Sequence, residues 1–77
     1  MVEVFKTTVN KREHAQVLVD EIQKAFRGYR VNFDLEDCDR ILRVEYHEGN
    51  IRSSELIGLL IKSGFQAEVL AGDLKNI

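Results

Sequence analysis

The chain has 77 residues, of which 44% are hydrophobic and 31% are charged, and its formal net charge is −2 at pH 7. This length limits it to one domain with a modest core, and the slightly acidic balance argues against DNA or RNA as a partner. The single cysteine, Cys38, excludes an internal disulfide. No long apolar run follows Met1, so the sequence predicts no membrane insertion and a cytoplasmic location.

The first predicted elements are a strand over residues 4–9 and a helix after it. The strand segment is β-branched or aromatic except for one lysine. Asn10, with Glu13 three residues later, has the pattern of a capping box at the start of the helix, and Gly28 is expected to end it. Apolar residues at three- or four-residue spacing define the buried face of this helix: Ala15, Leu18, Val19, Ile22, Ala25 and Phe26.

Two segments of alternating apolar and polar residues follow and predict a β-hairpin. They cover residues 29–36 and 42–47, and period-2 alternation is typical of antiparallel strands with one buried face. If residues 37–40 form the turn, Leu35 faces Leu42 on the buried side. In this register Asp34 also lies across from Arg43, so the register that pairs the apolar side chains also pairs opposite charges.

A second helix and a last strand complete the pattern. Asn50 or Ser53 is expected to cap the helix, Gly64 to end it, and residues 65–70 to form the strand. The inward side chains of the helix are predicted to be Leu56, Ile57 and Leu60.

The element order predicts an α+β fold, a ferredoxin-like βαββαβ two-layer sandwich with an antiparallel sheet in the strand order 4-1-3-2. Residues 1–70 are expected to form this domain and residues 71–77 a C-terminal tail. In this topology the loops at residues 9–14, 37–40 and 62–64 emerge at one end of the sheet, which we call the loop end. The connection at residues 46–50 emerges at the other end.

The segment SELIGLLIKSGFQAEV, residues 54–69, resembles the second half of the heavy-metal-associated domain, and the likeness covers roughly residues 3–70. The resemblance implies the ferredoxin-like fold and a soft-metal site on a Cys-x-x-Cys pair between the first strand and the first helix. Here that place reads Asn-Lys-Arg-Glu-His, with Lys11 and His14 about where the two cysteines would be. Ammonium and guanidinium groups are poor ligands that repel a cation. The chain is therefore interpreted as a degenerate member without the thiolate site.

The favoured function is a small non-enzymatic binding module, without a cofactor, whose partner is another protein or a second copy of the chain. Its contact surface is expected at the loop end, on an apolar strip of the helix layer, or on both. In metal-binding relatives a lysine near Lys62 balances the charge of the metal–dithiolate group; here it is interpreted as a solvated lysine that suits the helix dipole. The candidate surface residues are Lys11, Arg12, His14, Cys38 and Lys62 at the loop end, and Val17, Ile57 and Ile61 on the strip.

Two other functions stay open as alternatives. The first is a metal chaperone or sensor that binds Zn, Ni or Cu through His14 and Cys38, with Asp37 and Asp39 beside the thiol. The favoured interpretation of these two residues is different: His14 is an exposed residue of the first helical turn, and Cys38 is a residue at the hairpin tip. The second alternative is a regulatory domain that binds an amino acid at a dimer interface, since that fold variant also uses two βαβ halves.

The sequence contains no catalytic constellation, and two functions common on this fold are disfavoured. An acylphosphatase needs a glycine-rich loop, and although Arg12 and Asn32 are present, those glycines are not. An RNA-recognition domain needs aromatic side chains on the open sheet face to stack on bases. The solvent-side positions expected here include none: Lys6, Thr8, Arg43 and Glu45.

Overall fold

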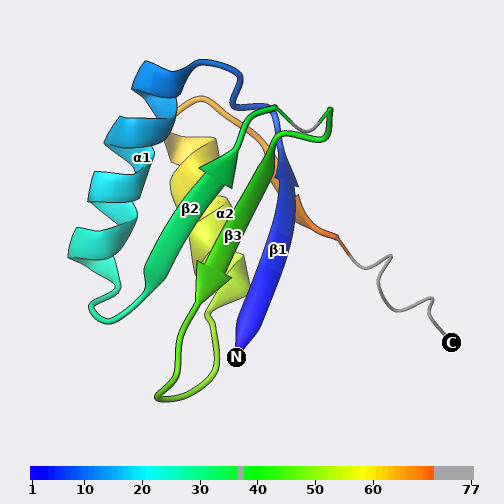
Figure 1. Cartoon of the computed structure of the whole chain (residues 1–77). Coiled ribbons are helices and arrows are strands. Elements are labelled where there is room, and N and C mark those ends of the chain that lie inside the picture. Colours follow the sequence, from blue (N-terminus) through cyan, green and yellow to red (C-terminus); the bar gives the residue numbers. More distant parts are fainter. Residues whose placement is uncertain (37, 71–77) are drawn as a thin grey trace, which may run out of the picture.

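The computed structural model describes residues 1–36 and 38–70, and it contains six elements in the predicted order. These are β1 (Val2–Thr7), α1 (Arg12–Ala25), β2 (Arg30–Asp34), β3 (Ile41–Glu45), α2 (Ser53–Lys62) and β4 (Ala67–Val69). The strands form one antiparallel sheet in the order β2-β3-β1-β4, and both helices lie on the same face of it (Figure 1). Read from the β4 edge, this order is 4-1-3-2. The α+β, two-layer arrangement is compatible with a ferredoxin-like fold, and the predicted tail at 71–77 lies outside the described residues.

The core fills the space between the helix layer and the sheet. Both helices turn the predicted apolar faces inward, and the largest fully buried side chains are Phe5, Val9, Leu18, Ile22, Leu42, Val44, Leu56 and Leu60. Ala25 was expected on the buried face and is exposed instead. It is the last residue of α1, where the chain leaves the helix so that Phe26, and not Ala25, packs against the core.

Neither helix is capped by the side chain that the sequence predicts. Lys11 occupies the N-cap position of α1 and Arg52 that of α2, and neither helix start has a side-chain capping hydrogen bond. The capping box at Asn10 is therefore wrong by one residue. In α2 a distant residue contributes instead, because the backbone N–H of Arg52 donates a 3.0 Å hydrogen bond to the hydroxyl of Tyr29. At the other end of α2, Gly64 has a φ of +99°, the left-handed conformation that the sequence predicts.

The β2–β3 register differs from the prediction. Asp34 lies across from Ile41 rather than Arg43, a shift of two residues, and Arg43 lies across from Asn32. The predicted Asp34–Arg43 pair is therefore wrong. β2 ends at Asp34, whose carboxylate accepts a 3.3 Å hydrogen bond from the backbone N–H of Glu36 and turns the chain. Because side chains alternate with period two, the shift leaves each of them on its predicted face.

Neither of the helices in the described part of the chain has the length and apolar character needed to cross a membrane. With ten and fourteen residues, both are helices of the usual length for a globular core.

Candidate functional site

Hydrogen bonds join the three loops of the loop end. The backbone N–H of Thr8 donates to the carbonyl of Gln66 at 3.1 Å, and the N–H of Gln66 donates to the Thr8 hydroxyl at 2.9 Å. These bonds connect the start of the first loop to the chain before β4, 58 residues further on. The sequence prediction that these segments emerge at the same end of the sheet is confirmed for the described residues.

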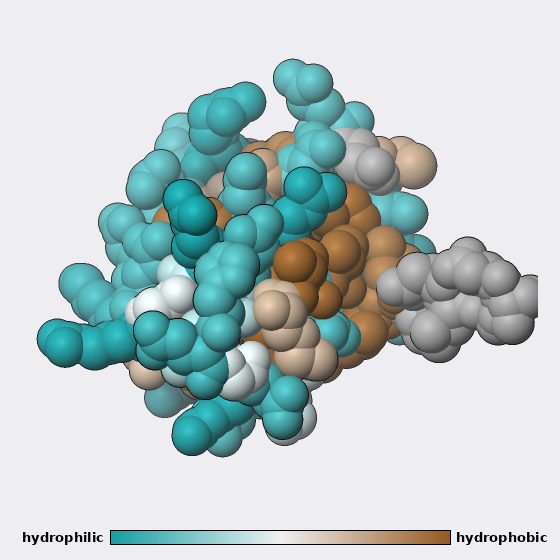
Figure 2. All heavy atoms as spheres, turned by 60° about the horizontal axis from the view of Figure 1, so that its bottom comes forward, coloured by the Kyte–Doolittle hydropathy of each residue, from teal (hydrophilic) through white to brown (hydrophobic). Residues whose placement is uncertain are grey.

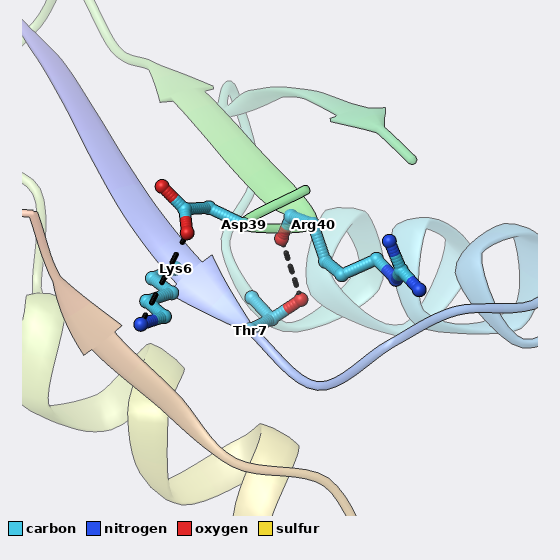
Figure 3. A network of polar contacts seen from close by, with 4 residues as sticks. All are labelled: Lys6, Thr7, Asp39 and Arg40. Atoms are coloured by element: carbon cyan, nitrogen blue, oxygen red, sulfur yellow. Dashed lines mark hydrogen bonds and ion pairs between the residues drawn. The ribbon is translucent and has the colours of Figure 1, made fainter. Parts of the chain in front are cut away.

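Thr7 connects the same loop to the β2–β3 hairpin (Figure 3). Its side chain is buried, with 6% of the residue exposed, and its hydroxyl donates a 2.7 Å hydrogen bond to the carbonyl of Arg40. The same oxygen accepts a 3.2 Å hydrogen bond from the backbone N–H of Val9. Beside it, Lys6 Nζ lies 4.0 Å from Asp39 Oδ1 at the surface. A buried hydroxyl with both partners therefore holds the hairpin against the loop that precedes α1.

The loop end displays three cationic side chains that the sequence singled out. Lys11 and Arg12 are exposed at the N-terminus of α1, and Lys62 is exposed in the last turn of α2. The His14 ring lies against the Phe65 ring, with centroids 5.3 Å apart and planes inclined by 53°. This contact brings the first turn of α1 next to the segment that follows α2, and the His14 ring makes it from an exposed position.

The described residues form no cluster of ligands that would support a metal site. Cys38 is an exposed free thiol. Within residues 1–36 and 38–70, no group of three or more His, Cys, Asp or Glu side chains is placed to hold a metal ion. Asp37, one of the acidic neighbours named for this site, lies outside the described residues. A site at His14 and Cys38 thus stays a prediction.

The apolar strip on the helix layer is narrower than predicted. Val17 on α1 and Ile61 on α2 are 55% and 58% exposed, whereas Ile57 is partly buried against the core. Other exposed apolar side chains, which the sequence did not single out, belong to Met1, Val2 and Val69. The end that carries the N-terminus is mostly hydrophilic, with apolar surface gathered on one side of the view (Figure 2). The alternation in β1, which buries Phe5, predicts that Val2 lies on the open face of the sheet.

An aromatic cluster at the opposite end of the sheet was not predicted from the sequence. The rings of Phe26 and Tyr29 are stacked, with centroids 5.0 Å apart, and those of Tyr29 and Tyr46 are 4.7 Å apart and inclined by 52°. A Cβ on Gly28 would lie only 3.1 Å from Tyr46 Cε1, so the backbone closely approaches this ring. Because the Tyr29 hydroxyl already accepts the Arg52 N–H, the cluster serves to close the core and to position the start of α2.

No family model, curated protein or solved structure matches this chain. The resemblance to heavy-metal-associated domains therefore rests on the sequence of residues 54–69 and the element pattern alone.

Proposed function

We propose that this chain is a non-enzymatic binding module with the frame of a heavy-metal-associated domain and without its thiolate metal site. The observation that supports this most directly is the exposure of Lys11 and Arg12 at the start of α1, where the family carries its metal ligands. A protonated ammonium or guanidinium does not coordinate a metal cation. Both groups form charge-assisted hydrogen bonds with carboxylates, so this position suits the recognition of a protein surface.

The partner that fits the loop end is a protein with an acidic surface patch. The His14–Phe65 contact places the start of α1 beside the end of α2, so Lys62 contributes a third positive charge to the same end. Among the described residues, no ion pair engages Lys11, Arg12 or Lys62. A cationic side chain that is not already engaged by a carboxylate of its own chain can bind an incoming carboxylate without first breaking an ion pair. Such contacts set the association rate and its salt dependence.

Charge reversal tests this assignment against a matched control at the opposite end of α1. Lys11→Glu with Arg12→Glu should abolish capture of a partner that the parent chain retains. Lys24→Glu in the last turn of α1, combined with Arg27→Glu just after the helix, should leave that capture intact, because both side chains are exposed at the far end. Capture should also weaken as salt rises from low to physiological concentration, because exposed charges are screened over about 10 Å at 0.1 M salt. If both double variants still captured the partner as well as the parent chain does, the loop end would be ruled out as the contact surface.

A metal titration distinguishes this proposal from the chaperone alternative. One equivalent of Zn(II), Ni(II) or Cu(I) is added to the isotope-labelled chain while each backbone amide signal is followed. The binding-module proposal expects the signals of residues 10–15 and 38–40 to stay in place. A joint, saturable shift of both groups of signals would establish a metal site at His14 and Cys38 and overturn the proposal.

A further inference from the structure

In the part of the chain that the structure describes, β2 is an edge strand, and its outward backbone groups can be assigned from the register. Met1 and Tyr46 exchange both of their backbone hydrogen bonds, at 2.6 and 2.8 Å, so this pair faces across the β1–β3 ladder. In an antiparallel ladder the residues of a strand face their two neighbours alternately. Ile41, Arg43 and Glu45 on β3 therefore turn their peptide groups toward β2, where Arg43 lies across from Asn32. It follows that Val31 and Phe33 turn their N–H and C=O groups toward the open edge.

The space beside this edge is a depression and not a packed interface. It runs between the start of α1 and β2, and its lining includes Val19 on the helix and Val31, Phe33 and Leu35 on the strand side. All four side chains are only partly buried. Unpaired strand edges with adjacent apolar surface are templates for pairing with another strand.

The side chains of β2 have a charge pattern that is complementary to itself. From Arg30 to Asp34 the strand reads Arg-Val-Asn-Phe-Asp, with a cation at its start, an anion at its end and an amide at its centre. All three polar side chains are exposed on the sheet face away from the helices, while Val31 and Phe33 point to the helix side. Two such strands placed antiparallel about a two-fold axis at Asn32 set Arg30 of each copy opposite Asp34 of the other.

We propose that two copies of this chain associate through β2, and that their two sheets join into one with four strands from each copy. The pairing places Val31 opposite Phe33 of the second copy, so the peptide groups that face the open edge become each other's partners. This is the one symmetric register that pairs all five residues of β2. A shift of the axis to Val31 or Phe33 leaves the strand ends unpaired and sets no Arg30 opposite an Asp34.

The energetics of the pairing favour a weak, specific dimer. Cross-strand pairs of opposite charge stabilise a sheet, and like charges directly opposite each other destabilise it. The symmetry doubles each contribution, because each copy supplies one arginine and one aspartate. This dimer goes beyond the proposed function. Arg12 lines the depression beside β2, whereas Lys11 and Lys62 are not among its lining residues and remain available to a partner.

Two single charge reversals and their mixture test the proposal. Arg30→Asp sets two aspartates against each other across the two-fold axis, and Asp34→Arg sets two arginines against each other, so each variant alone should self-associate at least about tenfold more weakly than the parent. A 1:1 mixture of the two variants restores both opposite-charge pairs and should associate again, which also shows that both variants are folded. Arg43→Asp, on the same sheet face but inside the sheet, is the matched control and should leave association unchanged.

Sedimentation at chain concentrations from about 10 μM to about 1 mM covers the range of a weak interface. Amide hydrogen exchange in the same samples should show concentration-dependent protection at Val31 and Phe33 and none at Ala67 on the β4 edge. A parent chain that stays monomeric over this range would overturn the proposal. So would association that both variants retain, association that the mixture fails to restore, or protection absent from Val31 and Phe33. Capture of an acidic partner by the loop end is measured separately, with the double variant of Lys11 and Arg12.

Discussion

Replacing Thr7 with valine tests whether a buried hydroxyl stabilises the loop end. Valine has nearly the same shape, so the substitution removes the hydrogen bonds to the Arg40 carbonyl and from the Val9 N–H without leaving a cavity. The N–H of Val9 is buried and loses its partner, as does one carbonyl lone pair. Each net hydrogen bond contributes about 1 kcal/mol, and an unsatisfied buried group costs about 1–3 kcal/mol. We therefore expect the free energy of unfolding to fall by about 2 kcal/mol.

Urea unfolding followed by circular dichroism measures this change, and thermal unfolding should show a melting temperature lower by about 8–16 °C for a domain of this size. Thr8→Val is the matched control. The Thr8 hydroxyl also accepts a backbone N–H, at 2.9 Å from Gln66, but it does so at the exposed surface, where water replaces it. The control should lose less than about 0.5 kcal/mol. Equal losses for the two variants, or no loss for Thr7→Val, would refute the reasoning.

Two further predictions concern the backbone and the aromatic cluster. Gly28→Ala and Gly64→Ala both place a side chain at a left-handed φ, +90° and +99°, which costs about 1–2 kcal/mol. Only the Cβ at residue 28 meets a neighbour, Tyr46 Cε1 at 3.1 Å, so Gly28→Ala should have the lower urea midpoint, and a reversed order would contradict this account. Tyr29→Phe removes the acceptor of the Arg52 N–H and should cost about 1 kcal/mol and speed exchange of that amide. Tyr46→Phe, which keeps that hydrogen bond, should leave exchange at Arg52 unchanged.

The sequence alone determined the order of the elements and the face on which most of their side chains lie, with Ala25 as an exception. Both follow from local periodicity. The three- and four-residue spacing in α1 predicts the burial of Leu18 and Ile22, and the alternation in β2 predicts which residues face the helices. The exposure of Lys11 and Lys62 also follows from the sequence, because both residues lie at helix termini and the helix termini of this topology are in contact with solvent.

The tertiary structure decided what pairs with what. The β2–β3 register depends on how many residues the connecting turn uses. A shift of two residues leaves the alternation of buried and exposed side chains unchanged, so the sequence pattern does not distinguish Ile41 from Arg43 as the residue across from Asp34. The same holds for contacts between residues far apart in the chain, such as Thr7 with Arg40, His14 with Phe65, and Tyr29 with the start of α2. No local pattern encodes them, because they form only when the helices and the sheet have packed. Which backbone groups of β2 remain open at the sheet edge is decided in the same way, by the registers of two ladders.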